Sequence, residues 1–237
     1  MMKIFLFLFF SILLFAQDRV LLHIDFKGIA DATDATEILH QKGFEFQLDK
    51  DRFHFFIKDE RLYIETKQKA AVLFGMILHN KKELKNPAYV EIEWGVERFP
   101  ENADWENGIN RLPIALIMVF GMDKLSSGLP ILAPKAPTFL CPFIGQKEKV
   151  GKVYLGKLYK KGGRYYCVSN QGDGVVVHTL FSVEQAYKKA FDKAIPALTA
   201  FAFQSNTKDT KGGAKAFIKS LTIYAKDGKY NTKEEEK

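Results

Sequence analysis

The sequence is poor in the residues from which metal and redox sites are usually built. It has two cysteines and five histidines in 237 residues, so a disulfide-rich scaffold is excluded. The histidines show no HxH, HxxxH or HExxH spacing, and the cysteines do not form a CxxC pair, so the chain carries no zinc signature. A GxSxG motif and a complete phosphate-binding loop are also missing. The sequence therefore predicts neither a metal nor a cofactor.

Arginine is scarce, although the chain is basic overall. The formal net charge is +7, but only six of the 35 basic residues are arginine. A basic protein can bind nucleic acid, yet no basic patch alternates with aromatic residues as in the known nucleic-acid modules. We therefore expect no nucleic-acid partner, and an anionic membrane or polysaccharide stays open as a weakly attracted surface.

Long hydrophobic runs are also absent, apart from one at the N-terminus. Residues 4–15 (IFLFLFFSILLF) follow Lys3 and precede Ala16, which is typical of an export signal with a small residue at the cleavage point. A bilayer-spanning helix needs about 20 apolar residues, so this run is too short for a comfortable permanent anchor. We predict a signal peptide at 1–16, no stable membrane span after its cleavage, and a periplasmic or secreted protein. Because Leu14 stands where a small residue is preferred, a retained N-terminal anchor is the alternative.

The rest of the chain is dominated by apolar residues at every second position. In residues 89–96, Val90, Ile92, Trp94 and Val96 share one face of an extended strand, which is typical of a half-buried antiparallel strand. Residues 114–120 (IALIMVF) are apolar at every position, which predicts a central strand covered on both faces. Further strands are expected at 20–26, 53–57, 62–64, 70–78, 138–143, 153–159, 165–169, 175–181, 198–204 and 216–224.

Only two segments have a helical pattern, residues 32–41 and 183–193. In the second, Ser182 with Gln185 offers a capping box, and Pro196 follows the end. Many short strands with few helices predict an all-β fold, an antiparallel two-sheet sandwich of the jelly-roll type with one or two short helices. We expect one domain over residues 17–225 and a mobile charged tail at 226–237.

Export would place the two cysteines in an oxidising compartment. Cys141 and Cys167 both lie in strand-like surroundings, so a disulfide between adjacent strands is one interpretation, worth about 3 kcal/mol. Two buried free thiols are the other. The sequence leaves both open.

The segment most typical of a binding site is the loop of residues 98–111 (RFPENADWENGINR). It joins two strands, and in it Trp105 stands between Asp104 and Glu106, with Asn110 and Arg111 close by. An exposed tryptophan flanked by amides and carboxylates can stack on a sugar ring and bind its hydroxyl groups. The alternative is that Trp105 folds back and closes the end of the sandwich.

Three carboxylates form a second candidate site. Glu91, Glu93 and Glu97 share parity, and residues two apart on a strand lie about 6.6 Å apart, which is near the separation of the two carboxyl groups of a glycosidase. The alternative is a solvated outer face whose charges oppose aggregation.

The chain resembles a family of exported bacterial proteins that is catalogued as a domain of unknown function. The matching stretches are AVLFGMIL, AYVEIEWGVERFPENADW, LPIALIMVFG, FSVEQAYKKAF and ALTAFAFQSNTKDTKGGAKAFIKSLTIY. The resemblance implies a jelly-roll sandwich. Family members tend to have acidic residues where Asn110, Arg111, Ser205 and Asn206 stand here, so a shared cation site is not implied for this chain.

These features favour an exported, non-catalytic sandwich that binds a carbohydrate or another envelope component. A glycoside-cleaving enzyme that uses Glu91 and Glu93, and an envelope module that recognises protein, are the alternatives. The oligomeric state is not predicted.

Overall fold

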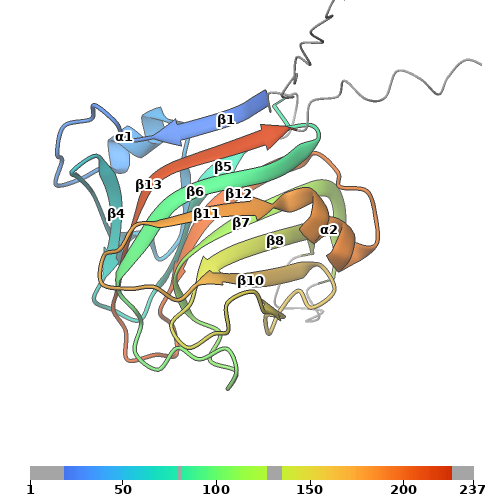
Figure 1. Cartoon of the computed structure of the whole chain (residues 1–237). Coiled ribbons are helices and arrows are strands. Elements are labelled where there is room, and N and C mark those ends of the chain that lie inside the picture. Colours follow the sequence, from blue (N-terminus) through green and yellow to red (C-terminus); the bar gives the residue numbers. More distant parts are fainter. Residues whose placement is uncertain (1–18, 79–81, 127–134, 226–237) are drawn as a thin grey trace, which may run out of the picture.

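Two β-sheets packed face to face make up most of the computed structural model (Figure 1), which describes residues 19–78, 82–126 and 135–225. The predicted signal peptide and charged tail lie outside these residues. Within the described ranges, every helix is too short and too polar to cross a bilayer. The predicted two-sheet sandwich is confirmed.

The first sheet, called sheet A, has six strands. They are β1 (Arg19–Asp25), β3 (His54–Lys58), β4 (Arg61–Thr66), β6 (Pro87–Arg98), β11 (Val177–Ser182) and β13 (Ala214–Ala225). Their order is β11-β6-β13-β4-β3, and β1 also pairs with β13. β4 and β1 pair with successive halves of β13, so they share one of its edges.

The second sheet, sheet B, has seven strands in the order β2-β5-β12-β7-β8-β10-β9. They are β2 (Glu45–Leu48), β5 (Ala71–Ile77), β7 (Leu112–Leu125), β8 (Ala136–Ile144), β9 (Val153–Tyr154), β10 (Gly163–Ser169) and β12 (Leu198–Asn206). Every pair in the described sheets is antiparallel except β8 with β10, which run parallel. This pair departs from the purely antiparallel arrangement that the sequence predicted.

The main core lies between the sheets and follows from the alternation of apolar residues. Val90, Ile92 and Trp94 on β6 face Leu116 and Met118 on β7, and all five are fully buried. The indole N–H of Trp94 is satisfied by the hydroxyl of Thr179 at 3.0 Å. Strand β7 pairs with both β12 and β8, so the prediction of a central strand is confirmed.

Both expected helices form, and the first is shorter than predicted. Helix α1 (Thr36–Gln41) begins late because the backbone N–H groups of Ala32 and Ala35 bind carbonyls of β3. Helix α2 (Val183–Phe191) begins directly after Ser182, but the serine side chain makes no capping hydrogen bond. Val183 and Tyr187 are the buried residues of α2, which lies at one end of the sandwich beside β11 (Figure 1).

Two further predictions differ from the structure. The strand expected at 153–159 is reduced to β9, and the following residues form a loop. Strand β2, which has two glutamine or glutamate residues among four positions, was not predicted. It is one of the two edge strands of sheet B and has one half-buried residue, Phe46, so its sequence lacks a clear apolar alternation.

The disulfide interpretation is wrong, because Cys141 and Cys167 are both free, buried thiols. On the parallel strands β8 and β10, Cys141 is paired with Tyr165, whereas Cys167 is paired with Phe143. That offset of two residues places the two Cα atoms about 8 Å apart for ideal strands. A disulfide requires less than about 7 Å.

Candidate functional site

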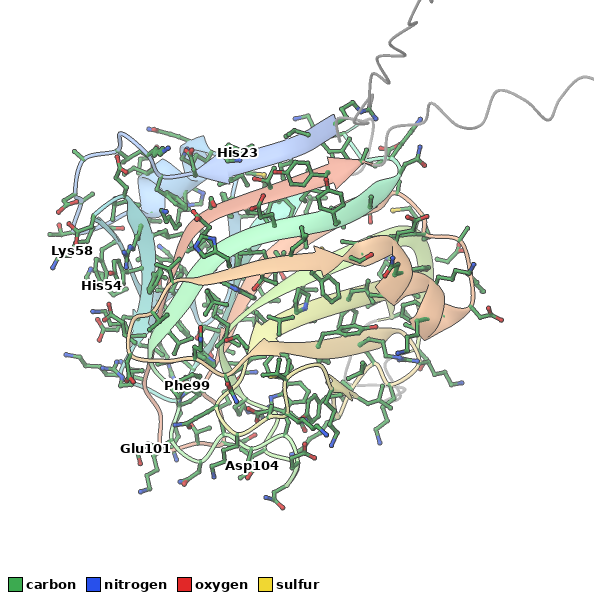
Figure 2. All side chains as sticks on the ribbon, viewed as in Figure 1. His23, His54, Lys58, Phe99, Glu101 and Asp104 are labelled. Carbon is green, nitrogen blue, oxygen red and sulfur yellow. The ribbon has the colours of Figure 1, made fainter. Side chains whose placement is uncertain are left out.

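The loop of residues 98–111 lies at one end of the sandwich, between β6 and β7. Figure 2 shows Phe99, Glu101 and Asp104 together at this end, well away from His23 on β1. Of the two interpretations of Trp105, the exposed ring is wrong and the folded-back ring is the one observed, because only 6% of its surface is accessible. The loop folds back onto the outer face of sheet B, which is the face turned away from sheet A.

Trp105 belongs to a second, smaller hydrophobic cluster on that outer face. The indole ring packs at 5.1 Å from Phe143, 4.7 Å from Tyr165 and 5.8 Å from Tyr154, measured between ring centroids. Its N–H donates to the backbone carbonyl of Arg111 at 3.0 Å. Because aromatic neighbours surround the ring, Trp105 cannot offer an open face to a sugar, although its edge can still line a pocket.

The two carboxylates beside Trp105 are engaged by nearby basic and polar groups. Hydrogen bonds from Asn107 lower the pKa of Asp104, and Lys147 lies 3.6 Å away. Glu106 accepts hydrogen bonds from Lys152 at 2.5 Å and from the hydroxyl of Tyr154 at 2.7 Å, and these lower its pKa. Both groups therefore stay ionised near neutral pH, and neither lines the pocket described next.

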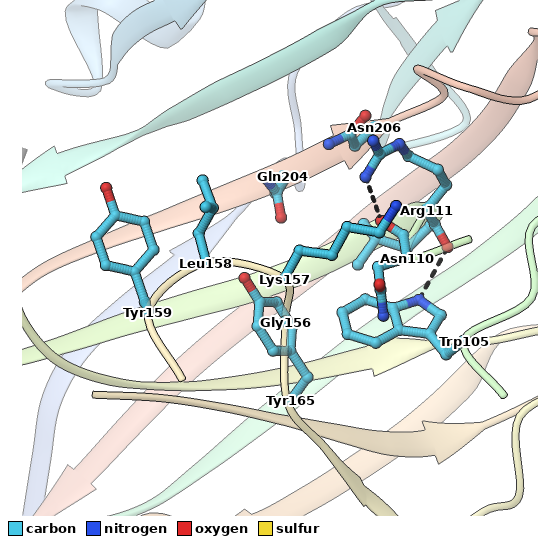
Figure 3. A pocket seen from close by; sticks show the side chains of 11 residues that line it. Trp105, Asn110, Arg111, Gly156, Lys157, Leu158, Tyr159, Tyr165, Gln204 and Asn206 are labelled. Atoms are coloured by element: carbon cyan, nitrogen blue, oxygen red, sulfur yellow. Dashed lines mark hydrogen bonds between the residues drawn. The ribbon is translucent and has the colours of Figure 1, made fainter. Parts of the chain in front are cut away.

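A pocket of about 200 Å³ opens beside this cluster (Figure 3). Trp105 and Arg111 lie at one end and Tyr159 at the other, with Gln204 between them. The walls come from the loop before β7, from the β9–β10 connection and from the end of β12. The lining residues are Trp105, Asn110, Arg111, Leu112, Gly156, Lys157, Leu158, Tyr159, Tyr165, Gln204 and Asn206.

Several polar groups in the pocket have no hydrogen-bond partner among the residues that the structure describes. The side-chain amides of Asn110 and Gln204 make no hydrogen bond to any other described residue, and neither does the ammonium group of Lys157. Asn206 uses its amide oxygen to accept from the N–H of Lys208 at 3.1 Å. Burial raises the pKa of Tyr165 far above its ordinary value, so its phenol stays protonated and can donate a hydrogen bond.

Arg111 holds two walls of the pocket together. Its guanidinium group binds the carbonyl of Lys208 and pairs with the carboxylate of Asp209, both in the loop after β12. It also donates to the carbonyl of Asn110 at 2.7 Å. An arginine has five donors in a fixed plane, so one side chain can fix several acceptors at once. Arg111 therefore acts first as a clamp.

The predicted carboxylates of β6 lie elsewhere, on the outer face of sheet A. Glu91 accepts a hydrogen bond from Tyr224 at 2.9 Å, and Glu97 pairs with Lys215 at 2.6 Å. Glu93 is contacted by three groups, which are Lys219 at 3.1 Å, His178 at 3.2 Å and Ser220 at 3.2 Å. None of the three glutamates lines the pocket, and their contacts fit a solvated face carrying balanced charges.

Of the five binding residues predicted from the loop, the pocket brings together Trp105, Asn110 and Arg111 and leaves out Asp104 and Glu106. The prediction missed the contributions of the β9–β10 connection and of β12. A weak signal was present in each, because Tyr159 directly precedes the basic and turn-forming residues 160–163 (KKGG), and Gln204 follows the mostly apolar run of residues 200–203 (AFAF).

Comparisons with known proteins give likenesses of structure alone. No protein-family model matches the chain, and no curated protein matches its sequence. The resemblance to an exported family of unknown function therefore stays a prediction.

Among solved structures, similar chains include a low-affinity xylan-binding module, CBM86, from Roseburia intestinalis. It has a TM-score of 0.32 and 12% identity, over 76% of this chain and 93% of that one. The xyloglucanase domain of a type three effector from Sinorhizobium fredii has a TM-score of 0.39 and 9% identity, over 77% and 93%. A laminarinase catalytic domain from Thermotoga petrophila has a TM-score of 0.36 and 9% identity, over 90% and 100%. With TM-scores this low, the inference of function depends on the pocket alone.

Proposed function

We propose that this chain is an exported β-sandwich protein that binds a carbohydrate, with one sugar unit held in the pocket between Trp105 and Tyr159. The observation that carries the proposal is that one cavity combines tyrosine side chains with amide groups that bind no other residue in the described ranges. Export is proposed from the sequence of residues 1–16, and the same pocket would serve another polyhydroxylated component of the envelope.

The chemistry of the pocket suits a sugar. A pyranose ring has apolar C–H faces and a belt of hydroxyl groups that both donate and accept hydrogen bonds. The amides of Asn110 and Gln204 also donate and accept, while the rings of Tyr159 and Tyr165 supply apolar surface with a polar tip. Every side chain of this set can therefore find a counterpart on the ligand.

The size of the pocket limits what it can enclose. Pockets for drug-sized ligands have volumes of about 300 to 1,000 Å³, whereas this one has about 200 Å³. The volume favours a single sugar unit, with the rest of an oligosaccharide extending over the surface.

We propose binding without cleavage, because no lining residue carries a carboxylate. Glycoside hydrolysis ordinarily uses two carboxyl groups about 5 to 9.5 Å apart on either side of the scissile bond. Asp104 and Glu106, the nearest carboxylates in the loop, are held by lysines and a tyrosine outside the lining.

Tryptophan fluorescence and calorimetry on the purified protein test the proposal. The sequence contains two tryptophans, and Trp94 lies in the core between the sheets, so a Trp94→Phe variant that still folds reports from Trp105 alone. Titration with a panel of neutral and charged oligosaccharides should change its emission for at least one member. If calorimetry and fluorescence detect no binding anywhere in the panel, the proposal is wrong.

Matched variants connect any binding to the pocket. Gln204→Leu and Tyr165→Phe should each weaken the affinity about tenfold, because each removes a hydrogen-bonding group from the lining. The controls are Gln47→Leu, on the exposed edge strand β2, and Tyr166→Phe, whose hydroxyl instead binds the carbonyl of Ala186. Binding that is insensitive to both pocket variants would contradict a site at this position.

A further inference from the structure

The basic charge of the chain is concentrated in one short segment beside the pocket. Residues 147–164 contain six lysines, one arginine and one glutamate, which is a net charge of +6 out of +7 for the whole chain. The other 219 residues together carry +1. The excess is therefore local, and the segment that carries it includes the β9–β10 connection, which forms one wall of the pocket.

Part of this charge is neutralised by the neighbouring loop and part is not. Lys147 pairs with Asp104 and Lys152 with Glu106, so these two lysines hold the loops together. Lys157, Lys160 and Lys161 make no ion pair to any described residue. Lys157 itself lines the pocket, and the other two directly follow the lining residue Tyr159.

The pocket itself has the same sign. Its two charged lining residues are Arg111 and Lys157, and it has no acidic one. The partner of Arg111, Asp209, lies mostly in solvent and outside the lining. The Lys157 ammonium group is therefore the open charge at this site, next to amides that can bind hydroxyl groups.

We propose that the ligand is an anionic polysaccharide, whose unit in the pocket carries a carboxylate or sulfate that pairs with Lys157. The inference rests on the proposed function, since it specifies the class of sugar that the same pocket binds. The chain of the polysaccharide continues past Lys160 and Lys161, where further acidic units meet further ammonium groups. Attraction of this kind is weakened by added salt, because dissolved ions screen charges on the surface.

An anionic membrane is the competing partner, because the same segment exposes Val150, Val153, Leu155 and Leu158. Membrane-binding surfaces combine basic and apolar side chains on one face. Here Tyr154 and Val153 are adjacent on β9, and Tyr154 packs in the cluster on the outer face of sheet B. Val153 therefore points to the opposite face from the pocket, so a flat bilayer does not engage this residue and the pocket-lining Leu158 in the same way.

Matched pairs of polymers test the inference on the purified protein. Polygalacturonate and its fully methyl-esterified form share one backbone and differ in charge, as do dextran sulfate and dextran. We expect at least one charged polymer to bind at least tenfold more tightly than its uncharged partner. The advantage should shrink when NaCl is raised from about 0.05 to about 0.5 M.

Two lysine variants locate the effect. Lys157→Gln should reduce affinity for the charged polymer about tenfold, while Lys58→Gln, at the exposed last position of β3 (Figure 2), should leave it unchanged. Charged-polymer binding that Lys157→Gln does not alter would overturn the inference, since it would reflect attraction to the surface in general.

The remaining outcomes separate this inference from the proposed function. The protein could bind neutral glycans through Gln204 and show no preference for the charged polymer of each pair. That result overturns the inference of an anionic ligand but agrees with carbohydrate binding. A protein that binds vesicles of phosphatidylglycerol but no glycan overturns both. Binding of charged polymer that needs Lys157 and Gln204 supports both.

Discussion

Glu148 accepts a hydrogen bond from the backbone N–H of Trp105 at 3.0 Å, across 43 positions of sequence. Its other carboxylate oxygen accepts from the N–H groups of Gln146 at 2.8 Å and Lys147 at 3.1 Å. Only 2% of Glu148 is exposed. This carboxylate thus fastens the loop before β7 to the loop after β8, and with it the position of the indole that ends the pocket.

Replacing this carboxylate should destabilise the loop. In Glu148→Gln an N–H₂ group must face backbone N–H donors on one side, which leaves at least one buried donor without a partner. We expect a loss of about 1 to 3 kcal/mol in the free energy of unfolding, measured by denaturant titration, and a red shift of Trp105 emission. Glu45→Gln, at an exposed position of β2, is the control and should unfold like the natural protein.

The clamp made by Arg111 gives a second prediction. Arg111→Lys keeps the positive charge but cannot reach the carbonyls of Asn110 and Lys208 and the carboxylate of Asp209 together. We expect a loss of about 1 kcal/mol in unfolding free energy and a several-fold weaker ligand affinity, measured by calorimetry. Arg19→Lys, at the start of β1, is the matched control. An unchanged affinity would show that the loop after β12 keeps its position without the contacts of Arg111.

The free thiols predict a specific response to alkaline pH. Burial raises the pKa of Cys167 to about 11, against an ordinary value near 9. Above about pH 9 the unfolded chain therefore binds fewer protons than the folded one, and the free energy of unfolding falls as the pH rises toward 11. The loss should be on the order of 2 kcal/mol, measured as unfolding in denaturant at about pH 8 and pH 10.5.

A Cys167→Ala variant isolates this effect, because burial also raises the pKa of Cys141, and this thiol and the tyrosines remain in the variant. The pH-dependent loss should be smaller in the variant. In the absence of reductant, two thiols per molecule of the unfolded natural protein should react with a disulfide reagent. The thiols of the folded protein should react slowly because both sulfur atoms are buried. Recovery of no thiols from freshly prepared protein would mean that the cysteines are paired after all.

Glu93 should matter for stability in acid and not for ligand binding. Burial raises the pKa of Glu93. Two influences together lower it by more than burial raises it, namely the hydrogen bonds from Lys219 and Ser220 and the positive charges of Lys219 and His178. The net shift of the pKa is therefore downward. Its stabilising effect is thus present above about pH 4.5 and is lost as the pH falls through the lowered value.

The variant Glu93→Gln should therefore show a flatter decline of melting temperature between about pH 6 and pH 3. At pH 7 the cost should stay below about 1 kcal/mol, as for other exposed ion pairs. Its glycan affinity should equal that of the natural protein. Hydrolysis of any bound glycan that disappears in Glu93→Gln would restore the enzymatic alternative.

The sequence predicted the fold well wherever one face of a strand is buried and the other is wet. The alternation of Val90, Ile92 and Trp94 locates β6 within a few residues. Residues 153–159 (VYLGKLY) are also rich in apolar residues, but Leu155 and Leu158 are exposed, so apolar content without a regular alternation did not identify a strand there. The parallel pairing of β8 with β10 depends on the end of the sheet at which the chain enters β10. The alternation of apolar residues carries no information about this.

The site was predicted in part, and the reason lies in its construction. Asn110 and Arg111 stand beside Trp105 in sequence, so one loop pointed to all three. Tyr159, Tyr165 and Gln204 reach the pocket only because three separate segments meet over sheet B. Whether Trp105 faces solvent was undecidable from the loop itself, since its burial depends on Phe143 and Tyr165, which lie 38 and 60 positions later.

The parallel pair has a consequence for how this surface can vary. Two neighbouring antiparallel strands can be joined by a tight turn. Two neighbouring parallel strands need a longer connection, because the backbone must return along the length of the first strand before the second one begins. Here that return path is the lysine-bearing connection of residues 145–162. Its lengthening or shortening would reshape the rim of the cavity while the hydrogen-bonded ladders stay as they are, so the shape of the rim can vary without any change in the two sheets.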